Sequence, residues 1–338
     1  MNEESIVGEL PDAIAHSLTK KLEALPIPTL YQTRLETAIA EALSRWKDDP
    51  NTIHSLIVLG SPAEEIGTVL NSIFKGESFQ DLPIRRCFDE RPQDYRDIVS
   101  KLKTCVSEES GNQPNQEFVL IPDLTDCFLR CINGLDGILY LRNAIAENRS
   151  CFWVIGCNYW AWQYLDYICH THAAFEESIS LPVLMRSHLQ EYLFDINSSI
   201  EKEFELTKKT TEDAYWERLT GISSGIPRVA KSLWLRSFST ESSDSLFIQN
   251  EPNLPNPPDL SGSDRYLLYS LILHEKMTLS QLASSLGEND SFIHSEIQEL
   301  RKIRVIQGDL SSLQLNPIYY PWLRLELDRN NFLVGGKN

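Results

Sequence analysis

Between residues 28 and 185, short apolar runs alternate with stretches in which apolar side chains have helical spacing. The segments SLIVLG, FVLIPDL and CFWVIGCN are almost continuously apolar, a pattern typical of parallel strands buried on both faces. PIRRCFDE and SISLPVL are weaker strand candidates. The helical stretches between them indicate crossover connections. The sequence therefore predicts an α/β domain over residues 28–185, with a doubly wound, five-stranded parallel sheet.

The rest of the chain is predicted to be mainly helical. Residues 1–27 are interpreted as an N-terminal helix and residues 186–238 as a helical lid. Residues 239–262 are rich in Ser, Pro and Asn, a composition that resists packing and indicates a linker. Within the α/β domain, residues 127–148 are predicted as one long helix, and a break near its two glycines, Gly134 and Gly137, is left open.

The last segment, residues 263–338, has the pattern of three helices followed by a hairpin, which predicts a winged-helix domain. Thr278 is a candidate cap for the second helix, and Gly308 and Asp309 mark the hairpin tip. The run PIYYPWLRL after the hairpin is either core or an interface.

Charge narrows the possible partners. The net charge of −17 opposes non-specific binding to nucleic acid and to anionic membranes, and it favours a basic protein partner. No apolar run approaches the roughly 20 residues that a membrane-spanning helix needs. The acidic N-terminus has no signal-peptide pattern, so a cytoplasmic location is expected.

Seven cysteines lie between Cys87 and Cys169, mostly inside apolar runs. Their odd number and apolar surroundings predict reduced thiols in the core. Cys127 and Cys131 are four residues apart, and Cys169 is close to two histidines, but no two spaced ligand pairs occur. The sequence therefore predicts no metal site.

The connection after the first predicted strand has the layout of a phosphate-binding loop without its essential cation. Gly60 stands where such a loop has its first glycine, whereas Gly67 comes two positions late. No lysine occurs from residue 55 to 74, and Glu64 and Glu65 lie in the loop instead. Two carboxylates would repel a triphosphate and would themselves interact with the dipole at the start of the next helix. The alternative is an ordinary strand–helix connection, and both interpretations argue against ordinary ATP binding.

The order of these segments resembles the AAA+ ATPases, and in particular their origin-recognition, transposition-ATPase and STAND-like branches. The similarity rests on a helix, SLIVLG, a helix, FVLIPDL, CFWVIGCN, a helical lid with SGIPR, and a winged helix, and it covers residues 28–330. The resemblance implies a P-loop nucleoside-triphosphatase-like sheet and a nucleotide site at the carboxyl ends of its strands.

The resemblance also implies roles that this sequence only partly supports. The family ends its acidic strand with a magnesium-binding Asp and a catalytic Glu, whereas Pro122, Asp123 and Leu124 stand here, so no alignment supplies both groups. Asn158 matches the polar sensor after the next strand, and Arg228 in SGIPR matches the lid arginine. The alternatives are helix capping for Asp123 and Asn158, and a salt bridge to the core for Arg228.

The third helix of the C-terminal domain would enter the major groove if this domain bound DNA. Its first half carries Asp290, Glu296 and Glu299, and its basic residues lie at the opposite end. From Ser263 onward, 8 basic residues face 9 acidic ones, so the domain is nearly neutral. Contact with protein is therefore favoured over contact with nucleic acid.

These observations lead to one hypothesis for function and two alternatives. The chain is interpreted as a non-catalytic AAA+-like adaptor or regulatory subunit without a cofactor, whose partner is an active ATPase relative or further copies of itself. The first alternative is an ATP-dependent enzyme with an unusual loop, and the second is a DNA-binding regulator. No catalytic residues are assigned. The vestigial site comprises Gly60, Gly67, Asp123, Asn158 and Arg228, and Arg228 is expected to form a structural latch with Glu64 and Glu65.

Overall fold

The structure is a computed structural model that describes residues 12–49, 53–88, 90–107, 117–175, 177–193, 205–208, 213–242, 245–248, 251–252 and 254–332. The chain forms two compact units. The sheet unit contains residues 31–181, 258–316 and 323–338, and the helical unit contains residues 1–30, 182–257 and 317–322.

A five-stranded parallel sheet forms the centre of the sheet unit. Its strands are β1 (Ser55–Gly60), β2 (Ile84–Arg86), β3 (Glu117–Ile121), β4 (Cys151–Asn158) and β5 (Glu177–Ser180). They lie in the order β2-β3-β4-β1-β5, and every neighbouring pair is parallel. The predicted doubly wound parallel α/β fold is confirmed.

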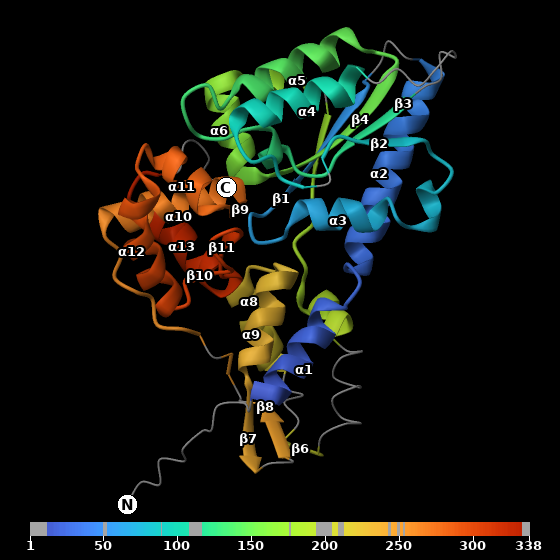
Figure 1. The fold of residues 1–338 in the computed structure, drawn as a ribbon. Coiled ribbons are helices and arrows are strands. Elements are labelled where there is room, and N and C mark those ends of the chain that lie inside the picture. Colours follow the sequence, from blue (N-terminus) through green and yellow to red (C-terminus); the bar gives the residue numbers. More distant parts are fainter. Residues whose placement is uncertain are drawn as a thin grey trace, which may run out of the picture. The chain divides into compact units, whose positions relative to one another are not determined.

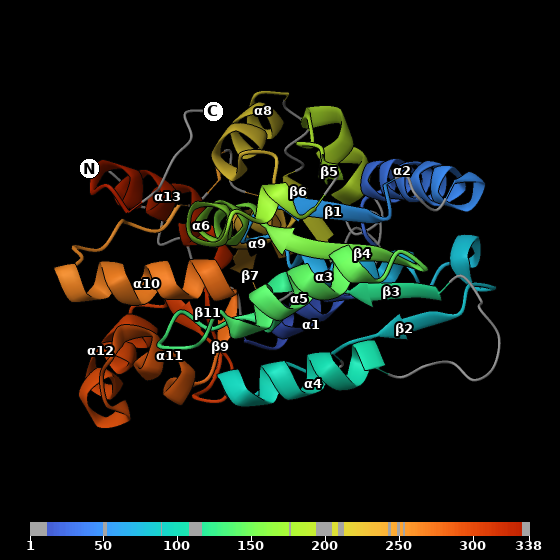
Figure 2. The same cartoon turned by 90° about the horizontal axis from the view of Figure 1, so that it is seen from above.

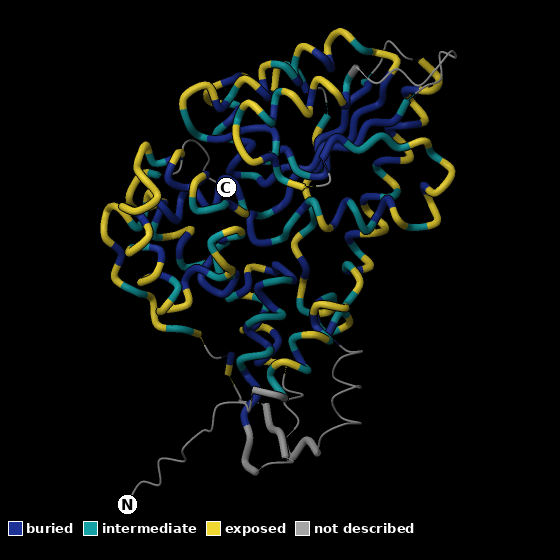
Figure 3. Tube along the Cα trace, viewed as in Figure 1, coloured by how far each residue is buried: buried dark blue, intermediate teal, exposed yellow. Residues whose placement is uncertain are grey.

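Helices cover both faces of this sheet (Figures 1 and 2). One face carries α2 (Thr29–Asp48) and α3 (Ile66–Ile73), which is followed by the short helix η1 (Glu77–Phe79). The other face carries α4 (Tyr95–Ser107), α5 (Asp136–Glu147) and α6 (Tyr159–Cys169), which is followed by η3 (Thr171–Ala173). Every residue of β1 and β4 is buried, because these central strands are covered on both faces (Figure 3).

The connection from β3 to α5 differs from the predicted long helix. A short helix, η2 (Leu124–Cys127), is followed by a turn in which the Leu129 N–H donates to the Gly134 carbonyl at 2.9 Å. A Cβ at Gly134 would lie 1.9 Å from the Leu129 oxygen, so the close approach of the two backbones requires glycine. Helix α5 begins only at Asp136, and the prediction was wrong for residues 128–135.

The C-terminal domain of the sheet unit, residues 262–315, has the predicted three helices and hairpin. These are α10 (Gly262–His274), α11 (Leu279–Leu286), α12 (Asp290–Lys302), β10 (Ile306–Gln307) and β11 (Leu313–Leu315). Thr278 caps α11 in a reciprocal pair with Gln281, which confirms the predicted cap. A two-residue strand that sequence analysis missed, β9 (Lys276–Met277), joins the hairpin in a three-stranded sheet.

The helical unit is described by itself. It contains α1 (Asp12–Glu23), a helical segment at 186–193, α8 (Asp213–Ser223), α9 (Pro227–Arg236) and η4 (Pro317–Tyr319), and α13 (Tyr320–Arg329) begins at its last residues. Of the predicted N-terminal helix, residues 1–11 lie outside the described residues. The start of PIYYPWLRL is buried at Pro317–Tyr319, as the core interpretation expects.

The predicted linker is not devoid of regular structure. Strand β7 (Phe238–Ser242) pairs antiparallel with β8 (Ser245–Ile248), and β6 (Glu205–Lys208) pairs parallel with β8. Part of the segment 239–262 that is predicted as a linker therefore forms paired strands. Strand β7, FSTES, is mostly polar and β8, SLFI, has only four residues, so neither leaves a strong strand pattern in the sequence.

Two of the seven cysteines are paired, which corrects the prediction that all are reduced. Cys87, directly after β2, and Cys105, in the last turn of α4, form a disulfide with Cα atoms 5.2 Å apart. The other five are free, as predicted. Sequence spacing could not show this pairing, because it depends on how α4 packs beside β2. In the described part of the chain, no helix is long and apolar enough to cross a membrane.

Gly156, in the middle of β4, generates a prediction about the sheet. A Cβ at this position would lie 2.1 Å from the Pro122 oxygen at the end of β3. We expect Gly156→Ala to lower the free energy of unfolding in urea by roughly 2–3 kcal/mol, because backbone has to move. The control is Gly221→Ala in α8, where a Cβ meets nothing within 4 Å and a gain of at most about 1 kcal/mol is expected. Equal stability of the two variants would contradict this packing.

Candidate functional site

The loop after β1 is occupied by a side chain of its own. The Glu64 carboxylate accepts a hydrogen bond from the Ser61 backbone N–H at 2.6 Å and another from the Tyr31 hydroxyl of α2. The Glu64 N–H donates to the Ser61 carbonyl at 2.9 Å, so residues 61–64 form a closed turn. In a phosphate-binding loop, backbone N–H groups of this kind point at a phosphate. Here the Ser61 N–H is directed at a carboxylate of the same loop.

Burial sets the protonation of this carboxylate. Desolvation raises the pKa of Glu64, and the hydrogen bonds from Tyr31 and Ser61 act in the opposite direction. A buried carboxylate is stable only where donors surround it, because leaving such a group without partners costs several kcal/mol. The loop therefore surrounds a carboxyl group of its own with donors, while burial favours the neutral form of that group.

Glu65 belongs to the same loop but faces the C-terminal domain. It immediately precedes α3 and has a positive φ of 52°, an uncommon conformation for a glutamate. Its carboxylate forms an ion pair with Lys276 of β9 at 3.1 Å. Gly67 lies in the first turn of α3, where a Cβ would make an ordinary van der Waals contact with the Asp123 Cβ at 3.4 Å.

Asp123 follows β3 and caps the short helix η2, as the capping alternative predicted. Its carboxylate accepts a hydrogen bond from the Thr125 N–H at 2.8 Å. Leu124, which one of the two alignments implied by the resemblance matches to the catalytic glutamate, is completely buried. Asp126, three residues farther on, forms an ion pair with Arg91 at 3.3 Å.

Asn158, at the end of β4, also acts as a cap. Its side-chain oxygen accepts from the Ala161 N–H at 2.8 Å at the start of α6. Its amide nitrogen donates to the Leu273 carbonyl at 3.1 Å and to the Ile272 carbonyl at 3.4 Å, both in the last turn of α10. Asn158, which the resemblance matches to a polar sensor, therefore bonds to α6 through its side-chain oxygen and to α10 through its side-chain nitrogen.

Arg91 and His274 are central to this region, and sequence analysis missed both. Arg91 donates to the His274 carbonyl at 3.0 Å, and its second terminal nitrogen lies 3.1 Å from His274 Nδ1. The Arg130 backbone N–H donates to His274 Nε2 at 3.2 Å. Burial lowers the pKa of His274 well below its ordinary value, and the charges of Arg91 and Arg130 act in the same direction. No signal in the sequence identifies Arg91, which lies in a polar stretch between β2 and α4.

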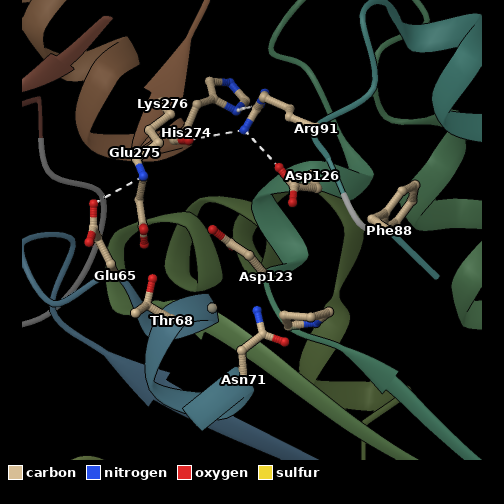
Figure 4. Close-up of a pocket in the computed structure, with 12 residues that line it drawn as sticks. Glu65, Thr68, Asn71, Phe88, Arg91, Asp123, Asp126, His274, Glu275 and Lys276 are labelled. Carbon is tan, nitrogen blue, oxygen red and sulfur yellow. Dashed lines mark hydrogen bonds and ion pairs between the residues drawn. The ribbon is translucent and has the colours of Figure 1, made fainter. Parts of the chain in front are cut away.

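These residues surround a cavity of about 240 Å³ at the carboxyl edge of the sheet (Figure 4). Figure 4 shows Glu65, Asp123 and Asp126 around it. Lys276 points toward Glu65, and Arg91 lies beside His274 and points toward Asp126. The lining residues come from the α3, β2–α4, β3–η2 and α10–β9 regions: Glu65, Gly67, Thr68, Asn71, Phe88, Arg91, Pro122, Asp123, Asp126, His274, Glu275 and Lys276.

Burial lowers the tendency of both Asp123 and Asp126 to ionise. Desolvation by burial, followed by the charge of nearby Asp126, raises the pKa of Asp123 to about 7. Burial also raises the pKa of Asp126, while Arg91 counteracts this effect. At neutral pH the pair therefore carries less than its full negative charge, as closely spaced buried carboxylates do.

Magnesium nucleotide does not fit the residues present. The loop has no lysine to reach the β and γ phosphates, and the Ser61 N–H already donates its hydrogen bond to Glu64. Asp123 is used as a cap, and Asp126 pairs with Arg91. Among the described residues, no group of three or more His, Cys, Asp or Glu side chains is placed to hold a metal ion.

Arg228 lies in the first turn of α9, in the helical unit. The two glutamates expected to pair with it lie in the sheet unit, where Glu64 is bonded to Tyr31 and Ser61 and Glu65 is paired with Lys276. The expected latch between Arg228 and these glutamates stays a prediction.

Comparisons with solved structures find chains of similar fold. RuvB of Thermotoga maritima, a Holliday junction branch migration motor, is 16% identical over 96% of this chain and 97% of that chain, with a TM-score of 0.36. Cdc6p of Pyrobaculum aerophilum is 11% identical over 95% of this chain and 99% of that chain, with a TM-score of 0.41. ORC2 of Aeropyrum pernix is 12% identical over 97% of this chain and 96% of that chain, with a TM-score of 0.36.

At such low identities the similarity concerns the fold alone. A scan against protein-family models found no match, and a search of the curated proteins found none either.

The shifted carboxyl group at Asp123 makes stability depend on pH. Its folded pKa of about 7 exceeds the value of 3.8 of an ordinary aspartate, so its contribution to stability is complete below about pH 4 and is lost as the pH rises through 7. Asp123→Asn keeps an oxygen for the Thr125 N–H and removes the charge. We expect this variant to be more stable than the wild type by roughly 1–3 kcal/mol at pH 8, and by less at pH 5.

Urea unfolding at pH 5 and pH 8 measures this difference in the free energy of unfolding. The control is Asp81→Asn, a change at an exposed residue. A stability difference between Asp123→Asn and the wild type that is the same at pH 5 and pH 8 would show that Asp123 ionises normally.

Proposed function

We propose that the protein is a non-catalytic AAA+-like adaptor or regulatory subunit that acts through protein–protein contact. The observation that carries this proposal concerns the Glu64 carboxylate in the loop, which accepts hydrogen bonds from the Ser61 N–H and from the Tyr31 hydroxyl. A triphosphate in the same loop would have to displace this buried carboxylate and would meet Glu65 as well. The loop keeps its shape through its own residues, so the scaffold does not need a nucleotide.

The carboxyl edge of the sheet supports the same proposal. Asp123 caps η2, Leu124 replaces the catalytic glutamate, and Asn158 bonds to the end of α10. Hydrolysis of a phosphoanhydride needs a metal ion and a positioned water. None of the residues that the resemblance assigns to these tasks is available for them.

The surface charge favours a protein over a nucleic acid as the partner. On α12, Asp290, Glu299 and Phe292 are exposed, and Phe292 keeps 61% of its surface accessible. Acidic side chains on this helix would face DNA phosphates unfavourably. The proposed partner is a protein with a basic surface, either an active ATPase relative or another copy of this chain.

Capture of partners by the tagged full-length protein, with and without Mg-ATP, tests the adaptor role. We expect the same proteins in the same amounts under both conditions, because binding does not require nucleotide. A partner set that changes at least tenfold in amount with Mg-ATP would contradict the proposal.

Turnover gives a second and independent test. The purified protein is expected to release no phosphate from Mg-ATP above the rate of the buffer. Phosphate release that is lost in the Asp123→Ala variant but kept in the Asp81→Ala control would show that the ATPase alternative is correct.

Arg228 is proposed to act as a structural latch with Glu64 and Glu65. The resemblance supports this, because it matches the SGIPR arginine to a lid residue that reaches the loop beginning at Gly60. Arg228→Ala should lower the free energy of unfolding by roughly 3–5 kcal/mol if the pair is buried, and its effect should be less than additive with Glu64→Gln and Glu65→Gln.

The control for the latch is Arg218→Ala, which removes an exposed ion pair with Glu251 and should cost no more than about 1 kcal/mol. If Arg228→Ala costs no more than this control, or if its effect is fully additive with the glutamine changes, the latch does not exist.

A further inference from the structure

A short segment between β2 and α4 holds the C-terminal domain against the sheet. We call residues 91–93 the clasp. Arg91 donates to the His274 carbonyl at 3.0 Å, and the Gln281 side-chain amide donates to the Pro92 carbonyl at 2.8 Å and to the Gln93 carbonyl at 3.1 Å. The clasp therefore contacts both the end of α10 and the start of α11.

The side chains that the C-terminal domain contributes to the clasp contacts are buried. His274 is completely buried and Gln281 retains only 4% of its accessible surface. Buried polar groups of this kind need their partners in place, because an unmatched donor or acceptor loses its hydrogen bond to water without replacement. Three residues that have no regular secondary structure of their own thus hold part of the C-terminal domain, together with the contacts of Asn158, Arg130 and Glu65.

The Cys87–Cys105 disulfide fixes the chain on both sides of the clasp. Cys87 follows β2 and Cys105 lies in the last turn of α4, so residues 91–93 lie inside the covalent loop that the two sulfurs close. Closing a loop reduces the number of conformations available to the enclosed segment. The five other cysteines are free thiols, so this disulfide is not part of a general disulfide framework.

We propose that the Cys87–Cys105 disulfide is a redox-sensitive staple that keeps the clasp in place and thereby holds the C-terminal domain over the carboxyl edge of the sheet. Reduction releases the clasp, loosens the contacts of Arg91 and Gln281, and opens the cavity between Glu65, Asp123 and Lys276. The inference is independent of the proposed function, because it concerns the docking of a domain and not the chemistry of the loop.

The reductant is a dithiol. One of its thiolates attacks a sulfur of the disulfide and forms a mixed disulfide, and the other cysteine leaves as a thiolate that takes up a proton. The second thiol of the reductant then attacks the mixed disulfide. Two electrons and two protons reach Cys87 and Cys105, and the dithiol leaves as a cyclic disulfide. Because Cys87 and Cys105 are only 9% and 6% exposed, the attack requires a local opening.

The first measurement establishes the bond itself. Protein purified without reductant is unfolded in denaturant, alkylated with iodoacetamide and weighed by mass spectrometry. We expect five labelled cysteines before treatment with dithiothreitol and all seven after it. Seven labels without the reductant would overturn the proposal.

The second measurement is hydrogen exchange of the folded full-length protein before and after reduction. We expect amides in residues 88–95 and 270–282 to exchange roughly tenfold faster after reduction, while those of β4 stay unchanged. The Cys87→Ser, Cys105→Ser double variant should exchange like the reduced protein in either buffer, and Cys131→Ser is the matched control.

Equal exchange of residues 88–95 and 270–282 in the oxidised and reduced wild type would overturn the staple. Because this comparison uses the wild type alone, it decides the question even if the double variant does not fold.

Discussion

Polar groups at the carboxyl edge of the sheet are buried, and each of them needs a hydrogen-bond partner to be stable. This constraint explains most of what surrounds the edge. Glu64 accepts hydrogen bonds from Ser61 and Tyr31, and Asp123 accepts one from Thr125. Asn158 bonds to the start of α6 and to the end of α10. In a nucleotide-binding relative, a ligand would satisfy part of this demand. Here Glu64, Asp123 and Asn158 are paired with groups of the chain itself.

The C-terminal domain belongs to the same network. His274 is buried between Arg91 and the Arg130 backbone, and Lys276 pairs with Glu65 across the cavity. Glu275, between them, has φ of 59°, a conformation that a non-glycine residue adopts only where its surroundings hold it. The C-terminal domain therefore supplies hydrogen-bond and ion-pair partners at the carboxyl edge of the sheet. Three residues between β2 and α4 make part of its contacts, and the proposed staple acts on this part.

Most of the sheet could be predicted from the sequence, but the set of residues that meet at the candidate site could not. The continuous apolar runs identified β1, β3 and β4, because strands buried on both faces leave a strong signal. The caps at Asp123 and Asn158 followed from their positions at strand ends. Arg91 and His274 gave no signal, since their importance comes from contacts between residues 183 positions apart. The pairing of β7 with β8 and the Cys87–Cys105 pair were missed because short strands and disulfide pairing depend on packing that no local pattern records.

The central claim is that Glu64 fills the loop in place of a phosphate, and calorimetric titration of the full-length protein with Mg-ATP tests it most directly. The account predicts no binding tighter than about 100 μM, which corresponds to roughly −5.5 kcal/mol. A dissociation constant well below this value, unchanged in the Asp81→Asn control and competed by ADP, would contradict it. Such a result would mean that a nucleotide displaces the Glu64 carboxylate from the Ser61 N–H.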